Sequence, residues 1–232
     1  MNEDENIAKP MLEIVDKRIR KIVDEGADFR LLRDLYLKSF WEKIKDIAGT
    51  SAGFTGLSEY IILRTIMDFL EKELEVKFHV LEKTKDVRFF VSSDRKILIT
   101  HSISINKGMK NAVQKKLNKE INWSTEEGMD RLQPDIVIFK LTNGVYEPKT
   151  IIQIKIYQMN DRVIGDEIGK LEKVATIGDP LMVILFFYEP TNKGVDELKE
   201  FTKNHPNRAF AILPNENVSF NEALCKIRNS LA

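Results

Sequence analysis

The sequence has few of the features that mark secreted or membrane proteins. Its single cysteine, Cys225, has no second cysteine with which to form an intramolecular disulfide. The N-terminal stretch MNEDENIAKPMLEIVDKRIRK carries too many charges for a signal peptide. The apolar run PLMVILFFY ends well short of the roughly 20 residues that span a bilayer. We therefore expect a cytoplasmic protein with no membrane partner.

An excess of either charge is also missing. Lys and Arg total 36, as do Asp and Glu, so the net charge does not attract a polyanion and any affinity for nucleic acid must be local. One segment departs from this balance, because it has several lysines and no acid. It contains Lys107, Lys110, Lys115, Lys116 and Lys119. We expect these lysines to contact DNA phosphates; the alternative is that they form only the solvated face of a helix.

The first part of the chain has a helical pattern. Apolar residues recur at helical spacing from about Met11 to Ala48 and are interrupted near DEGAD, which predicts two helices. A third helix is predicted to start near residue 58, with Ser58 as its N-cap. We expect residues 1–50 to form an N-terminal helical extension and residues 51–232 to form the main domain.

The main domain is predicted to contain both strands and helices. The blocks EVKFHVL, VRFFVSS and KILITHSISI are rich in β-branched and aromatic residues, which favours antiparallel strands. The lysine-rich segment, a hairpin, and then helices that alternate with the strands LMVILFFY and RAFAILP follow. This order predicts an α/β fold with a mixed central β-sheet flanked by helices on both faces.

The predicted hairpin carries polar residues in otherwise apolar strands. Its strands are DIVIFKL and TIIQIKIYQ, joined through TNGVYEPK. The two-residue period of a strand places Gln153 and Lys155 on one face, about 7 Å apart. Asp135 opens the first strand after Pro134, so it is expected at the edge of the sheet and near the middle of the partner strand. The alternative is a half-exposed hairpin in which Lys155 extends into water.

These residue types are typical of a metal-dependent phosphodiesterase. Glu59, near the start of the helix that precedes the strands, offers a further acid. In such sites two or three oxygen ligands hold magnesium, the metal lowers the pKa of its bound water, and a lysine steadies the nucleophile or the phosphate. Asp135, Gln153, Lys155 and Glu59 are therefore the candidate catalytic residues.

The segment QPDIVIFK followed by IIQIKIY resembles the PD-(D/E)xK nuclease superfamily, which has the restriction-endonuclease-like fold, in a variant with glutamine at the second acid position. The resemblance covers roughly residues 56–188. It implies Mg²⁺ as cofactor, with Mn²⁺ as a substitute, and Asp135 as the central metal ligand. It also implies that Lys155 lies beside the attacking water and that Glu59 and Gln153 are further metal ligands.

Gln153 departs from the family pattern, because an amide offers a divalent cation one neutral oxygen only. Glu167, twelve residues after Lys155, resembles the relocated glutamate of some family members. The alternative is that GDEIGKLEK is a solvated helix start whose acids favour the N-terminal end of the helix dipole. The sequence leaves open whether Glu59 or Glu167 completes the site, and it predicts His101 to be an ordinary strand residue.

The resemblance implies an Mg²⁺-dependent endonuclease that hydrolyses phosphodiester bonds of duplex DNA. The chain has the size of a stand-alone type II restriction enzyme, and an enzyme of this kind that cuts a palindrome acts as a two-fold homodimer. Two other functions stay open. One is a catalytically eroded DNA-binding or scaffold protein on the same fold, and the other is a nuclease that acts on RNA or branched DNA.

Overall fold

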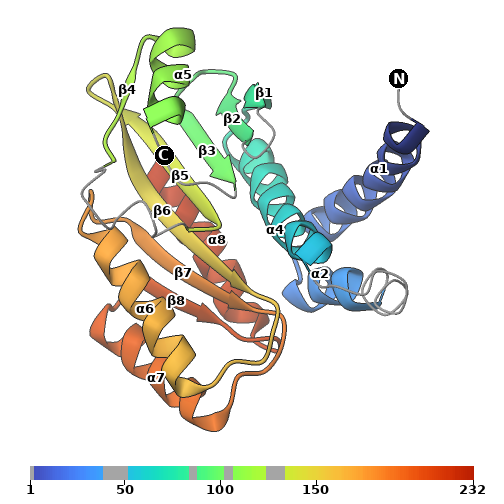
Figure 1. Cartoon of the computed structure of the whole chain (residues 1–232), viewed down its shortest axis with the longest axis vertical. Coiled ribbons are helices and arrows are strands. Elements are labelled where there is room, and N and C mark those ends of the chain that lie inside the picture. Colours follow the sequence, from blue (N-terminus) through green and yellow to red (C-terminus); the bar gives the residue numbers. More distant parts are fainter. Residues whose placement is uncertain (1–2, 39–51, 84–87, 102–106, 124–133) are drawn as a thin grey trace.

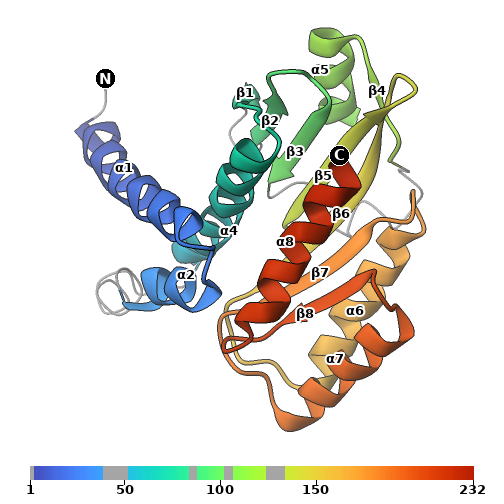
Figure 2. The ribbon, with the colours of Figure 1, turned by 180° about the vertical axis from the view of Figure 1, so that it is seen from behind.

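The computed structural model describes residues 3–38, 52–83, 88–101, 107–123 and 134–232. Within these residues the chain has an α/β fold in which helices cover both faces of one β-sheet (Figures 1 and 2). The strands are β1 (Phe78–Lys83), β2 (Arg88–Ser92), β3 (Ile97–His101), β4 (Glu120–Ile121), β5 (Ile136–Thr142), β6 (Val145–Lys155), β7 (Leu181–Phe186) and β8 (Ala209–Ile212). The helices are α1 (Glu3–Asp24), α2 (Phe29–Tyr36), α4 (Ala52–Glu73), α5 (Lys107–Leu117), α6 (Asp161–Ala175), α7 (Asn192–Asn204) and α8 (Asn217–Leu231).

The sheet is mixed, as the sequence predicted. Its strands follow the order β1-β2-β3-β5-β6-β7-β8, and the short strand β4 pairs separately with β6. Neighbours from β1 to β6 are antiparallel, whereas β6, β7 and β8 run parallel to one another. Strands β1, β2 and β3 come from the three β-branched and aromatic blocks, β5 and β6 from the predicted hairpin, and β7 and β8 from the part of the chain where helices and strands alternate. The sheet therefore joins two connection patterns at β6.

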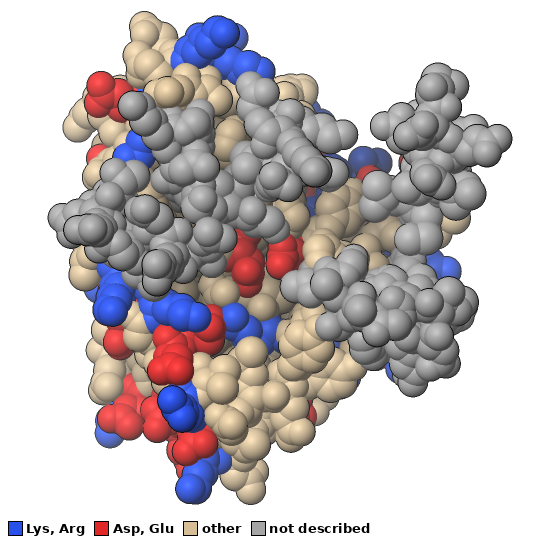
Figure 3. Space-filling view, viewed as in Figure 1, with Lys and Arg blue, Asp and Glu red and all other residues tan. Residues whose placement is uncertain are grey.

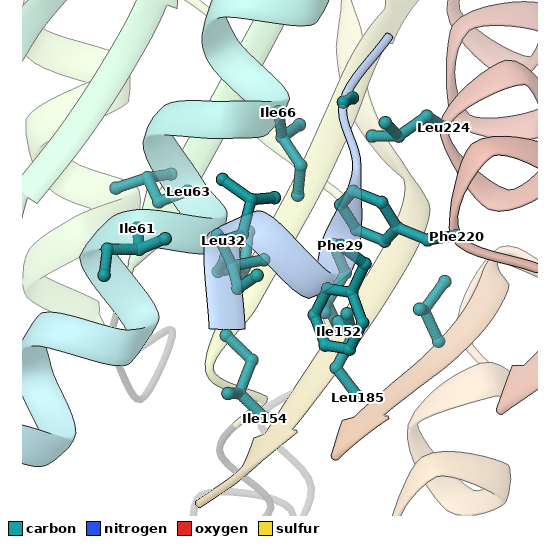
Figure 4. Close-up of a cluster of buried hydrophobic side chains, with 14 of the residues drawn as sticks. Phe29, Leu32, Ile61, Leu63, Ile66, Ile152, Ile154, Leu185, Phe220 and Leu224 are labelled. Atoms are coloured by element: carbon teal, nitrogen blue, oxygen red, sulfur yellow. The ribbon is translucent and has the colours of Figure 1, made fainter. Parts of the chain in front are cut away.

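Two hydrophobic cores lie on opposite faces of the sheet. Helices α1, α2, α4 and α8 pack on one face and form the first core, to which Ile152 and Ile154 of β6 contribute (Figure 4). Helices α5, α6 and α7 pack on the other face and form the second core, to which Ile151 of β6 belongs. Because successive side chains of a strand point to opposite faces, Gln153 and Lys155 point to the side covered by α6.

The N-terminal helices share the first core with the rest of the chain. Figure 4 shows Phe29 and Leu32 of α2 beside Ile152 of β6 and Phe220 of α8. Phe29 and Leu32 are fully buried. The domain boundary predicted near residue 50 lies outside the described residues. Among the helices that the structure describes, none is both long enough and apolar enough to cross a membrane.

Two details of the predicted elements are wrong. Helix α4 begins at Ala52 and not near residue 58, and Ser58 is buried inside it and is not its N-cap. The stripe that α4 packs into the core outweighs the low helix propensity of its glycines. The predicted hairpin loop is also too long, because β6 begins at Val145. Asn143 and Gly144 have φ angles of 51° and 87°, the positive values that a two-residue hairpin turn requires.

Candidate active site

The site is built where the start of β5 meets the end of β6. These strands are antiparallel, and Ile136 pairs with Ile152, so the residue before β5 lies beside the last residues of β6. Asp135 occupies that position. Its Oδ2 accepts a hydrogen bond of 2.5 Å from the backbone N–H of Ile154. The first strand thus fixes the carboxylate beside the residue that precedes Lys155, as the hairpin pattern predicted.

Lys155 is held by an acid from the helix that follows it. Its Nζ lies 2.6 Å from Glu167 Oε2, and the two side chains are only 12% and 10% exposed. Lys170 donates a hydrogen bond of 2.6 Å to the other oxygen, Oε1. Burial raises the pKa of Glu167, but the ammonium groups of Lys155 and Lys170 outweigh it and leave the pKa below its usual value. Glu167 is therefore a buried, ionised partner of Lys155.

This placement decides between the two interpretations of Glu167. Helix α6 starts at Asp161 behind the N-cap Asn160, so Glu167 lies in its second turn on the side that faces the sheet. Only 8% of the residue is exposed. The interpretation as part of a solvated helix start is wrong for Glu167, because α6 packs that side against the second core. It holds for Asp166, which is exposed.

Glu59 reaches the same region from the opposite face of the sheet. It lies in α4, is 9% exposed, and its Oε2 is 3.2 Å from Nε2 of His101. His101 ends β3 and pairs with Ile136 of β5, which places it next to Asp135 in the sheet. The sequence predicted an ordinary strand histidine and missed this contact, since it joins elements more than 40 residues apart. The helix acid itself was predicted.

The carboxyl of Asp135 has a strongly shifted pKa. Burial raises the pKa, the hydrogen bond from Ile154 lowers it, and the negative charges of Glu59 and Glu167 raise it further against the opposing charge of Lys155. The result is a pKa of about 7, compared with 3.8 for an unperturbed aspartate. Burial and the two neighbouring acids destabilise the ionised form of this carboxyl, and a cation bound beside it would stabilise that form.

The donor set fits a hard divalent cation, although it does not complete a coordination sphere. In the described part of the chain, no three His, Cys, Asp or Glu side chains lie together as in a preformed metal site. Carboxylate oxygens are the ligands that Mg²⁺ prefers, and Mg²⁺ usually keeps several waters and binds through one or two protein carboxylates. Oε2 of Glu167 is buried and has no well-aligned hydrogen bond, despite the nearby Lys155 ammonium. Asp135 with one neighbouring acid matches this requirement.

Gln153 lies on the same strand as Lys155, whereas the lysine-rich helix α5 lies away from Asp135 (Figure 1). Gln153 is half-buried in β6, pairs with Ile184 of β7, and lies on the same face as Lys155. Figure 3 shows acidic and basic side chains next to each other in the middle of the face that Figure 1 displays. Helix α5 lies instead at the end of the sheet where β5 turns into β6, away from the start of β5 (Figures 1 and 2).

Two of the five lysines of the lysine-rich segment contact the protein itself. Lys110 donates a hydrogen bond to the backbone carbonyl of Trp123, and Lys116 donates one of 2.7 Å to the carbonyl of Leu81. Lys115 is exposed and Lys119 is half-buried, whereas the side chain of Lys107 lies outside the described residues. The structure does not bring these lysines to Asp135, and their contact with DNA stays a prediction.

Comparison with known proteins adds no assignment. A scan against protein-family models, a search of curated proteins and a search of solved structures each found no match.

Proposed function

We propose that this protein is an Mg²⁺-dependent endonuclease of the PD-(D/E)xK superfamily that hydrolyses phosphodiester bonds of duplex DNA. We further propose that it acts as a sequence-specific type II restriction enzyme and as a homodimer, so that one site serves each strand. One observation carries the proposal. Asp135, with its raised pKa, is fixed by the N–H of Ile154 next to Lys155, which Glu167 holds at 2.6 Å.

In this proposal Asp135 is the principal metal ligand, and Glu167 or Glu59 is the second acid. Bound there, Mg²⁺ or Mn²⁺ would supply the positive charge that lowers the pKa of a bound water molecule and polarises a phosphoryl oxygen. Asp135 fits this role because burial and the neighbouring acids raise the pKa of its carboxyl to about 7, and a cation beside it would favour the ionised form. Gln153, with one neutral oxygen, is the weaker ligand.

Lys155 supplies the positive charge of the protein at the reacting phosphate. Its ammonium orients the attacking water and stabilises the negative charge that develops on phosphorus oxygens. Glu167 keeps this ammonium in one position, because a buried lysine without a partner is costly to keep ionised. Glu167 therefore acts on Lys155 even where it does not itself bind the cation.

The second candidate is a DNA-binding or scaffold protein with an eroded site. Two observations favour it: the charge of Lys155 is already paired with Glu167, and no group of three metal-binding side chains is present among the described residues. Titration with Mg²⁺ and Mn²⁺, followed by calorimetry, separates the candidates. The nuclease binds the ion and Asp135→Ala abolishes the binding, whereas the eroded protein shows no binding in either form.

The activity is tested by incubating the protein with mixed-sequence plasmid and phage DNA and Mg²⁺, with RNA and branched DNA as further substrates. We expect discrete DNA fragments from the unsubstituted protein and none from Lys155→Ala, because that substitution removes the ammonium that the strand pairing places beside Asp135. The matched control is Lys149→Ala, which changes a lysine of the same strand β6 far from its end. Intact nucleic acid in all conditions, from a folded protein, contradicts the proposal.

A further inference from the structure

A pocket of about 290 Å³ opens immediately beyond the candidate active site. It is lined by Tyr36, Ile156, Tyr157, Gln158 and Tyr188. Three of these side chains follow Lys155 directly in sequence, and Tyr188 follows β7, the parallel neighbour of β6. The pocket therefore lies at the carboxyl ends of two parallel strands, one residue beyond the lysine proposed to contact the phosphate.

Helix α2 supplies the third tyrosine, and several contacts hold it in place. Arg33 Nε donates a hydrogen bond of 2.6 Å to the backbone carbonyl of Phe187, and the ring of Tyr36 meets the ring of Phe187 edge-on with centroids 5.1 Å apart. The N–H of Phe187 in turn donates to the carbonyl of Lys155 over 2.8 Å. The wall of the pocket is thus tied to the backbone of the active-site strand.

The lining is aromatic, uncharged and open on one side. Tyr36 is 1% exposed and forms the inner wall, whereas Tyr157 is 45% exposed and forms the rim. Burial first, and then the neighbouring hydroxyls of Tyr157 and Tyr188, raise the pKa of Tyr36 to about 12, so this hydroxyl stays neutral. Among the described residues, no lysine, arginine, aspartate or glutamate lines the pocket, so this lining does not suit a phosphate or a metal ion.

We propose that this pocket receives one unstacked nucleobase of the nucleic-acid strand whose phosphate lies at Asp135 and Lys155. This inference rests on the proposed nuclease function. Aromatic rings bind the flat face of any base by stacking, and the amide of Gln158 offers a donor and an acceptor to a base edge. The volume is at the low end of that of ligand pockets, as a single heterocycle requires.

The position of the pocket relative to Lys155 supports the same ligand. Even a fully extended chain spans at most about 3.6 Å per residue, so Tyr157, two residues beyond Lys155, lies within the reach of one nucleotide from the phosphate site. A base can enter such a pocket from a single strand, or after it has been extruded from a duplex at the cost of its stacking and pairing. Both sources present the same flat ring to the tyrosines.

The test uses oligonucleotides that contain 2-aminopurine, whose fluorescence rises when the base leaves the stack. Binding is measured on the full chain carrying Lys155→Ala, in EDTA, so that no strand is cut. In this background we compare Tyr157→Ala with Tyr157→Phe, which keeps the ring. Leu31→Ala is the matched control, because Leu31 is 44% exposed on α2 and does not line the pocket.

We expect Tyr157→Ala to weaken binding of the single-stranded probe by about tenfold or more, because one base–aromatic stack is lost. The same substitution should abolish the fluorescence change. Tyr157→Phe and Leu31→Ala should bind as the background does. A fluorescence rise with duplex probe as well shows that the base is extruded, and a response to single strands alone shows that it enters unpaired. Equal binding by Tyr157→Ala and Leu31→Ala, or no binding by the background, overturns the inference.

The failure of this inference can be told apart from the failure of the nuclease proposal. The probe assay contains no metal and measures no cleavage, so an inactive protein with a functional base pocket still gives the fluorescence change. Conversely, cleavage by the unsubstituted chain together with unchanged probe binding by Tyr157→Ala leaves the nuclease proposal standing and removes the pocket.

Discussion

Replacing Asp135 by asparagine is expected to make the protein more stable at alkaline pH. In the folded chain the pKa of this carboxyl rises from 3.8 to about 7. Between pH 3.8 and about pH 7 the carboxyl holds its proton in the folded protein but loses it in the unfolded chain. The free energy of unfolding therefore falls as the pH rises through this range. Above pH 7 the folded protein carries the full cost of the ionised carboxylate. Asparagine has no such cost.

The size of the effect follows from the shift. Each pKa unit corresponds to 1.36 kcal/mol, so a rise from 3.8 to about 7 amounts to roughly 4 kcal/mol at most. Asparagine keeps a carbonyl oxygen that accepts the hydrogen bond from the N–H of Ile154, so this contact is retained. The difference between the two proteins should therefore come mainly from the charge.

Urea unfolding in EDTA at pH 4 and pH 8.5 measures this difference. We expect Asp135→Asn to match the unsubstituted protein near pH 4 and to exceed it by about 2–4 kcal/mol at pH 8.5. Asp196→Asn is the control, because the side chain of Asp196 is 75% exposed, and its effect should be the same at both pH values. A difference between Asp135→Asn and the parent that does not change with pH refutes the reasoning.

Two further predictions concern the partner of Lys155 and the first core. Glu167→Gln should lower the free energy of unfolding by about 3 kcal/mol at pH 7, because it leaves a buried ammonium without its charge partner; Glu172→Gln, on the same helix with a side chain 44% exposed, should change it little, and equal effects of the two would contradict the buried pair. Leu32→Ala should lower it by about 2–5 kcal/mol in a single transition, measured against exposed Leu31→Ala. If the main transition stays unchanged, α2 belongs to a separate extension.

The strand pattern correctly predicted where the polar side chains of the hairpin lie. Alternation in β6 placed Gln153 and Lys155 on one face, and the proline before Asp135 placed this carboxyl at the strand start, because strand period and strand entry are local properties. The α/β class and the mixed sheet followed from the order of blocks. These predictions needed no knowledge of how the helices pack.

The sequence pattern did not predict the contacts between elements that lie far apart in the chain. The pairing of Lys155 with Glu167 depends on how α6 rotates against the sheet, and the approach of His101 to Glu59 depends on the packing of α4 across β3. The early start of α4 at Ala52 was missed because Gly53 and Gly56 lower the helix propensity of this part of the sequence. Neither the spacing of residues nor their composition specifies such rotations.

The position of Asp135 and Lys155 at the end of the central sheet has a consequence for how such a protein can change over generations. Helix α4 supplies Glu59 from one layer, and helix α6 supplies Glu167 from the other. The strand residues are fixed by the sheet hydrogen bonds, whereas an acid on either helix can be exchanged for one on the other without moving a strand. A chain with this architecture can carry the neutral Gln153 in β6 and still receive negative charge near Asp135 from either layer.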